Sequence, residues 1–217
     1  MMNLAFVPPR GRRLSILCLG AHSDDIEIGC GGTILRLTRD FKDAVFSWVV
    51  FSSNERRKKE AERSADAFLK NVKQKNVFVE TFRDGFFPYI GAEIKEYFEK
   101  LKSRVSPDLI FTHYRFDLHQ DHRLLSDLTW NTFRDHLILE YEIPKYDGDL
   151  GSPNFFFGLD KSTCARKIAL LLKHFPSQRD NHWFNKATFQ ALLSLRGVES
   201  NVPEQCAEAF YSRKKVL

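Results

Sequence analysis

Short apolar runs alternate with segments of helical periodicity along the first half of this chain. Runs with the length and composition of buried strands span residues 14–19, 44–51, 77–79 and 109–111. Between them, apolar residues recur at helical spacing from residue 24 to 37, over 56–70 and over 90–105. Strands that alternate with helices predict an α/β fold, with a mostly parallel sheet and helices on both of its faces.

The second half of the chain is less regular. Further strands are expected over residues 137–141 and 155–157, and further helices over 164–174 and 183–195. The segment from Pro144 to Pro153 has the composition of a loop. Because the chain shows no internal repeat and no linker, we expect one domain over residues 1–217, with its core between about residues 14 and 210.

Composition sets broad limits on the class of protein. The 217 residues are 43% hydrophobic and 28% charged, as in ordinary soluble domains. A net charge of +5 favours anionic ligands but is too small to identify a partner. No run approaches the roughly 18 apolar residues of a membrane span. The first 13 residues lack the basic-then-apolar order of a signal peptide, so we expect a cytoplasmic protein.

The four cysteines form no closely spaced pair that would suggest a metal site or a redox motif. They are Cys18, Cys30, Cys164 and Cys206. In a cytoplasmic chain of this size, such residues are expected to be free and mostly buried thiols.

Polar residues cluster where two of the predicted strands end. His22, Asp24 and Asp25 follow the first strand. The segment His119–His122 comes shortly after the fourth strand, which ends at His113. Ligands of parallel sheets bind beyond the carboxyl ends of the strands. We therefore expect the two clusters to lie together and to form a functional site.

The residue types in these clusters suit a catalytic metal ion. His22 and Asp25 are three positions apart across a turn, and His122 offers a third ligand. Two imidazoles and one carboxylate leave a coordination position for water, as in catalytic zinc sites. Water bound there ionises near neutral pH and becomes a nucleophile. Asp24 is not needed as a ligand, and its carboxylate is placed to accept the proton of that water.

Other side chains of the second cluster complete the predicted chemistry. His119 shares a face with His122 if the segment is helical, and once protonated it would stabilise an oxyanion or protonate a departing amine. Either Asp117 or Asp121 would orient an imidazole from behind and raise its basicity. These residues predict a hydrolase with its own acid and base.

Two segments carry a resemblance to a known family. Residues 21–33, which include Ala21-His22-Ser23-Asp24-Asp25, resemble the opening motif of the PIG-L/LmbE-like metal-dependent N-acetylglucosaminyl deacetylases. Residues 119–122, preceded by Arg115 and Asp117, are similar to the second motif of that family. Weaker similarities occur at Arg57–Glu60, Ser177-Gln178, Arg196-Gly197 and Ala207–Phe210. The resemblance spans about residues 14 to 210.

The resemblance implies a Rossmann-like fold and removal of an N-acetyl group from an amino sugar or a sugar conjugate. It implies zinc bound by His22, Asp25 and His122, although another divalent metal is open. It further implies that Asp24 is the general base, that His119 is the acid or oxyanion partner, and that Arg57 contacts substrate.

The sequence departs from the family pattern at two positions. Ser23 stands where the family usually has proline, which loosens the expected turn but removes no ligand. Cys206 stands where the family often has an aromatic residue, so a substrate contact there is in doubt.

Several alternatives remain open at this stage. The Asp24-Asp25 pair also suits a simple helix cap, and Arg56–Lys59 suits a solvated helix face.

A basic phosphate-binding or nucleic-acid-binding module is a rival function, but no nucleic-acid motif is present. Two histidines and a carboxylate also serve iron oxygenases. An amidase for a non-sugar amide of secondary metabolism is a further alternative. The substrate, the oligomeric state and the roles of residues 141–154 stay open.

Overall fold

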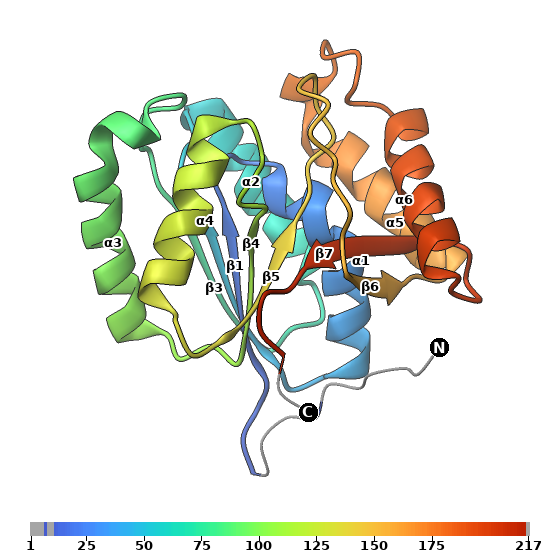
Figure 1. Ribbon diagram of the computed structural model, residues 1–217, viewed down its shortest axis with the longest axis horizontal. Helices are drawn as coiled ribbons and strands as arrows, with labels where there is room; N and C mark the ends of the chain where they lie inside the picture. The colour runs from blue at the N-terminus through green and yellow to red at the C-terminus, as the bar shows by residue number, and fades with distance from the viewer. Residues whose placement is uncertain (1–6, 8–10, 216–217) are drawn as a thin grey trace.

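Seven strands form one mixed sheet in the computed structural model, which describes residues 7 and 11–215 (Figure 1). Across the sheet, the strands are β3 (Gln74–Val79), β2 (Val45–Val50), β1 (Ser15–Gly20), β4 (Leu109–His113), β5 (Leu137–Tyr141), β7 (Ala207–Tyr211) and β6 (Phe155–Gly158). Strands β1 to β5 are parallel, whereas β7 is antiparallel to both of its neighbours. The chain reverses direction across the sheet between β1 and β4, as in Rossmann-like folds.

Helices cover both faces of the sheet. They are α1 (Asp25–Asp40), α2 (Glu55–Phe68), α3 (Gly91–Arg104), α4 (Gln120–Thr132), α5 (Lys161–His174) and α6 (Lys186–Ser200). Two short 3₁₀ turns, Phe87–Ile90 and Pro176–Gln178, precede α3 and follow α5. Helices α3 and α4 pack on one face, and the other four pack on the opposite face. The predicted fold class is confirmed.

Strand β1 shows why its sequence is an unbroken apolar run. Ile16 and Cys18 face the core beneath α1, α2 and α5, whereas Leu17 and Leu19 face the core beneath α3 and α4. Alternate side chains point to opposite faces of a strand, and both faces are covered here, so every position is apolar.

The observed element boundaries differ from the expected ones mainly in the second half. Helix α6 covers residues 186–200 instead of 183–195, and α5 begins three residues early, at Lys161. Strand β7 was not expected as a strand. It contains the Ala207–Phe210 segment and pairs with β5 and β6, so a chain-terminal strand lies inside the sheet.

Helix α1 packs unusually close to the sheet. A Cβ atom on Gly29 would lie 2.1 Å from the Tyr141 ring, so only glycine permits this approach. The helix is kinked at Cys30, whose φ of −141° is not helical. The kink frees backbone groups on either side of it, and these groups need partners inside a dry core.

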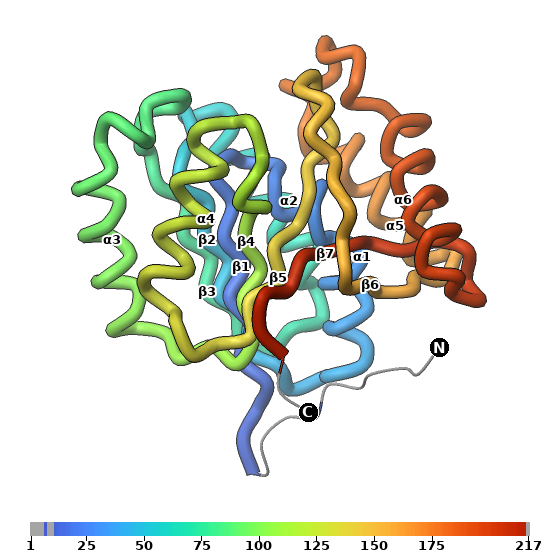
Figure 2. The backbone as a smooth tube through the Cα atoms, viewed as in Figure 1, coloured from blue at the N-terminus to red at the C-terminus, as the bar shows by residue number. Residues whose placement is uncertain are grey.

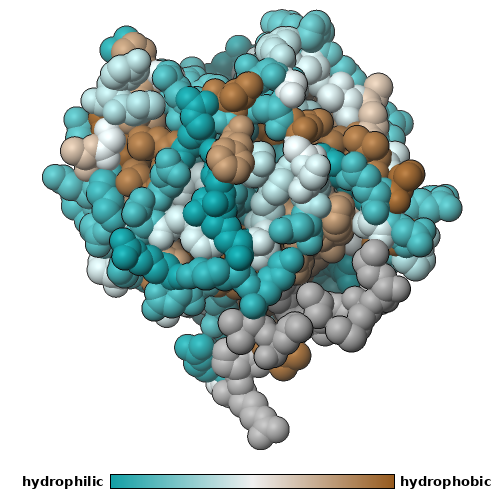
Figure 3. All heavy atoms as spheres, in the orientation of Figure 1, coloured by the Kyte–Doolittle hydropathy of each residue, from teal (hydrophilic) through white to brown (hydrophobic). Residues whose placement is uncertain are grey.

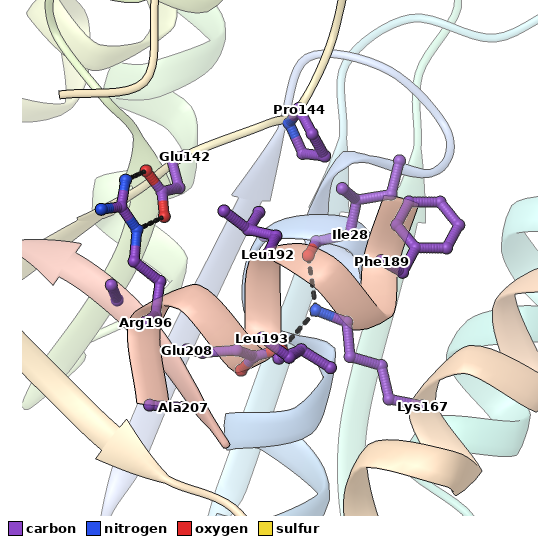
Figure 4. Close-up of a pocket in the computed structure, with 12 residues that line it drawn as sticks. Ile28, Glu142, Pro144, Lys167, Phe189, Leu192, Leu193, Arg196, Ala207 and Glu208 are labelled. Carbon is purple, nitrogen blue, oxygen red and sulfur yellow. Dashed lines mark hydrogen bonds and ion pairs between the residues drawn. The ribbon is translucent and has the colours of Figure 1, made fainter. Parts of the chain in front are cut away.

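A buried ion pair supplies those partners (Figure 4). Lys167 Nζ on α5 donates to the carbonyl oxygen of Ile28 at 2.6 Å and to Glu208 Oε1 at 2.5 Å. Glu208 on β7 accepts hydrogen bonds from the backbone N–H groups of Gly32 and Thr33, at 2.8 and 2.6 Å. Its carboxylate therefore caps the second segment of α1. Glu208 belongs to the last weak family similarity, and its role here is structural.

No helix among the described residues is long and apolar enough to cross a membrane. The face seen in Figure 3 is mostly hydrophilic, with apolar side chains in small scattered groups. The four cysteines are free and buried, as expected. Most of residues 1–13, which lack the order of a signal peptide, lie outside the described residues.

Replacing Lys167 with methionine should lower the free energy of unfolding by about 3 kcal/mol, because the Glu208 charge would stay buried without its cation. Urea unfolding followed by circular dichroism would measure the change. The matched control, Lys161→Met, alters an exposed lysine on the same helix and should change stability by less than about 0.5 kcal/mol. Equal stability of the two variants would contradict the assignment.

Candidate metal centre

Both polar clusters lie at the carboxyl edge of the sheet, as the sequence predicts. Strand β1 pairs directly with β4, and the turn after β1 and the loop after β4 lead into the first turns of α1 and α4. The backbone N–H of His22 donates to Asp25 Oδ2 at 2.6 Å, which closes the turn after β1. His119 stands at the N-cap of α4, and its Nδ1 accepts from the backbone N–H of Asp121 at 3.2 Å.

The three predicted metal ligands converge. His22 Nδ1 lies 3.1 Å from His122 Nε2 and 3.2 Å from Asp25 Oδ2. The third distance, from His122 Nε2 to Asp25 Oδ2, is 3.5 Å. Ligand atoms about 2.1 Å from one zinc ion at tetrahedral angles stand ~3.4 Å apart, so this donor set fits the ion. All three side chains are buried.

Carboxylates behind the two imidazoles favour the tautomers that ligation needs. His122 Nδ1 donates to Asp117 Oδ2 at 2.9 Å, which leaves the lone pair on Nε2. His22 Nε2 lies 3.1 Å from Asp84 Oδ1 and 3.4 Å from Asp121 Oδ2, so its proton is favoured on Nε2 and its lone pair on Nδ1. In each ring, the lone pair faces the other ring and Asp25.

Asp117 is itself held by several donors. The backbone N–H of His119 and the Lys145 ammonium contact its Oδ1 at 2.8 and 3.0 Å. Burial opposes ionisation, but the hydrogen bond from His122 and the nearby positive charges hold the pKa of Asp117 well below its ordinary value. Asp117 therefore stays an acceptor for the His122 imidazole at neutral pH.

Asp121 has a structural task in addition to its contact with His22. It accepts hydrogen bonds from the backbone N–H groups of Gly85 and Phe87, at 2.7 and 3.1 Å. This fully buried carboxylate fixes the loop after β3, and it does not line the cleft. Its contacts are those of a positioning residue, and a direct catalytic role stays a prediction.

A fourth imidazole, His113, lies behind the centre. Its ring stacks on His122 with centroids 3.9 Å apart, and its Nε2 is 3.2 Å from Asp25 Oδ2. The backbone N–H of Ala21 donates to the same nitrogen at 3.0 Å. Burial lowers the pKa of His113 to about 4, so the ring is neutral at pH 7. Asp25, His113 and His122 form one of several donor sets with atoms within 4.8 Å of one another.

Asp24 faces a cation instead of capping its helix. It occupies the N-cap of α1, but its side chain makes no capping hydrogen bond. Arg57 on α2 contacts Asp24 Oδ1 at 2.6 Å. Burial raises the pKa of Asp24, and the charge of Arg57 opposes that rise. The buried Arg57 Nε finds no acceptor among the described residues, so the guanidinium keeps a free donor beside the cleft.

The centre opens into a cleft with a cavity volume of about 270 Å³. The predicted residues that line it are His22, Asp24, Asp25, Arg57, His119 and His122. Asp84, Lys145, Gln178 and Trp183 also line it, and the sequence interpretation did not single them out as site residues. The Asp84-Gly85 pair after β3 was an available signal, because that loop lies at the same edge of the sheet.

The loop after β5 forms one wall of the cleft and is clamped from behind (Figure 4). Arg196 on α6 contacts both carboxylate oxygens of Glu142, at 2.7 and 2.6 Å, and donates to the carbonyl oxygen of Gly151 at 3.2 Å. It therefore holds both ends of the loop that carries Lys145 and Tyr146 into the cleft. Figure 2 shows this loop rising beside the segment that joins α5 to α6.

The fold and the buried histidine–aspartate centre define an α/β protein with a candidate site for a catalytic divalent metal. The model of the PIG-L family, described as GlcNAc-PI de-N-acetylase, matches residues 17–133. This match spans more than half of the chain, and the protein belongs to the PIG-L family. Comparison with curated proteins gave no match.

Solved structures with the same fold have diverse activities. The 4-carboxy-2-hydroxymuconate hydratase GalB from Pseudomonas putida KT2440 is 17% identical with a TM-score of 0.74, covering 94% of this chain and 98% of that one. N,N'-diacetylchitobiose deacetylase from Pyrococcus horikoshii is 19% identical with a TM-score of 0.63, covering 91% and 83%. The A40926 pseudoaglycone deacetylase Dbv21 is 17% identical with a TM-score of 0.67, covering 93% and 97%. At these identities the likeness shows the fold alone.

Replacing His122 with alanine should abolish stoichiometric zinc binding, because one of three donors is lost. The Asp117→Asn variant should bind zinc about 10 to 100-fold more weakly, because the carboxylate that orients His122 is gone. Isothermal titration calorimetry with zinc on the metal-free protein would measure both effects. His136→Ala, remote from the centre, is the control. Unchanged zinc affinity in His122→Ala would remove that residue from the ligand set.

Proposed function

We propose that this protein is a divalent metal-dependent amidohydrolase that removes an N-acetyl group from an amino sugar or a sugar conjugate. The observation that carries the proposal is the convergence of His22, Asp25 and His122 beside the Asp24–Arg57 pair, in an open cleft. Membership of a family whose model is described as GlcNAc-PI de-N-acetylase supports the reaction class.

His22, Asp25 and His122 would hold the metal ion, with zinc as the first choice for two imidazoles and one carboxylate. A bound ion of this kind would lower the pKa of its water molecule to near neutral. The same ion would polarise the carbonyl group of the amide. The other steps belong to side chains of the chain itself.

Asp24 would accept the proton from the attacking water. Its carboxylate lies beside Asp25 and inside the cleft, and a general base must be within hydrogen-bonding reach of the proton that it takes. Arg57 favours the ionised form of Asp24 that this task requires. The same side chain lines the cleft, where its guanidinium would contact a substrate oxygen.

His119 would stabilise the oxyanion. Because its Nδ1 accepts from the backbone of Asp121, the neutral ring carries its proton on Nε2. Burial and the neighbouring imidazoles lower the pKa of His119, which favours this neutral form. The Nε2–H would donate a hydrogen bond to the developing oxyanion, and the proton that Asp24 takes from the water would pass to the departing amine, leaving acetate and a free amino group.

The sugar part of the proposed substrate is supported by the description of the family model and by one neighbour that is named for a saccharide substrate. The Pyrococcus horikoshii neighbour is a diacetylchitobiose deacetylase, and Dbv21 is a deacetylase of a pseudoaglycone. A hydratase shares the fold, so the fold alone does not choose the reaction. A screen of N-acetyl sugars, sugar conjugates and non-sugar acetamides, read by primary-amine release, separates the sugar deacetylase from the amidase alternative.

Replacing Asp24 with asparagine should lower kcat by at least about 100-fold while zinc content stays unchanged, because the variant cannot take the proton. Amine release from the best substrate of the screen would give kcat, and atomic emission would give the zinc content. Asp135→Asn, an exposed change far from the cleft, should leave both unchanged. Near-normal turnover in zinc-loaded Asp24→Asn would show that another group is the base.

A further inference from the structure

A second cavity, of about 490 Å³, adjoins the cleft and is strongly basic. Its permanent cations are Arg56, Lys59, Arg63 and Lys173. The first three recur at positions i, i+3 and i+7 of α2 and so form one stripe along that helix. Lys173 comes from the last turn of α5, which lies alongside. We call this cavity the basic groove.

The cations of the basic groove are poorly neutralised. Within the described residues, Lys59, Arg63 and Lys173 have no carboxylate at ion-pair distance. Arg56 has one weak contact, with Glu60 at 3.8 Å. Of the acidic residues in the described part of the chain, Glu55 and Glu60 line the groove. Like charges gathered in a concave surface raise the potential there, and an anion would relieve their repulsion.

Glu60 offsets one of these charges and is fixed in place by a contact with the segment after α5. It is buried, and its two carboxylate oxygens accept from the backbone N–H and the hydroxyl of Ser177, at 3.0 and 2.5 Å. His174 also lines the groove. Burial, followed by the charges of Lys173 and Arg63, lowers the pKa of His174.

The groove and the cleft share a wall. Arg57 lines the cleft, whereas its neighbour Arg56 lines the groove. On the facing side, Gln178 lines the cleft and Pro176 lines the groove, on the two sides of Ser177. The contact between Glu60 and Ser177 joins the two segments of this wall. The cleft and the basic groove therefore lie on the two sides of one wall.

We propose that the basic groove binds a phosphate group carried by the substrate, so that the preferred substrate is a phosphorylated N-acetyl amino sugar. This inference rests on the proposed function. The acetamido group would lie at the metal centre, and the phosphate would lie across the shared wall. Guanidinium and ammonium groups from two helices match the several oxygens of a phosphate, which gains charge-assisted hydrogen bonds from each.

The test compares three zinc-loaded proteins. The groove variant carries Lys59→Gln, Arg63→Gln and Lys173→Gln. The control variant carries Lys42→Gln, Lys100→Gln and Lys102→Gln, which are exposed, line neither the cleft nor the groove and remove the same net charge. KM and kcat are measured for N-acetylglucosamine and for N-acetylglucosamine 1-phosphate.

The natural protein should have a KM for the phosphorylated sugar at least about tenfold below that for the neutral sugar. The groove variant should lose this preference through a higher KM for the phosphorylated sugar, with kcat unchanged. The control variant should keep it. Equal KM values for the two sugars in the natural protein, or equal effects of the two variants, would overturn the proposal.

A binding measurement separates failure of this inference from failure of the proposed function. If none of the proteins deacetylates either sugar, titration calorimetry with pyrophosphate judges the groove independently of the proposed function. A loss of at least about tenfold in pyrophosphate affinity confined to the groove variant would support phosphate binding in the groove. Equal pyrophosphate affinity in the groove and control variants would contradict it.

Discussion

The site depends on the parallel pairing of β1 with β4. This pairing brings the ends of two strands together, and with them His22 and His122, which are a hundred positions apart in the chain. Each strand end is followed by the start of a helix, so backbone N–H groups and carboxylates meet at the same edge of the sheet. Asp25 links the two strand ends, because its Oδ2 lies within 3.5 Å of the imidazoles of both His22 and His122.

Buried charges away from the centre hold its walls in place. Glu208 and Lys167 stabilise the kinked helix that begins at Asp25. Arg196 clamps the loop that carries Lys145, and Glu60 ties α2 to the turn at Ser177. Such pairs add little net stability when compared with apolar packing, but they allow few alternative arrangements. The weak family similarities outside the two main clusters coincide with these contacts.

Much of the fold was predictable from the sequence, because strands covered on both faces are continuously apolar and are separated by helices of clear periodicity. The placement of His22, Asp25 and His122 at one edge followed from the same rule. Strand β7 was not predictable in this way. Its Glu208 is buried, and a charged residue interrupts the apolar pattern of a strand unless its partners on α1 and α5 are known.

Some site contacts depend on tertiary structure that no local pattern reveals. Lys145 contacts Asp117 from a loop whose two ends are held by Arg196 on α6. Glu60 directly follows the Arg56–Lys59 run, which also suits a solvated helix face, yet it is buried against Ser177, 117 positions away. Gly197 similarly lets α6 approach the backbone at Gln205, where a Cβ atom would lie 2.3 Å from the carbonyl oxygen. Contacts over such separations follow from packing.

Anomalous diffraction at the zinc edge, from crystals grown with one equivalent of zinc, tests the metal centre most directly. We expect one dominant peak about 2.0–2.2 Å from His22 Nδ1, His122 Nε2 and an Asp25 carboxylate oxygen, with a further position open toward the cleft. A fully occupied zinc ion bound elsewhere, with His22, Asp25 and His122 unligated, would contradict the metal-dependent chemistry proposed for this protein.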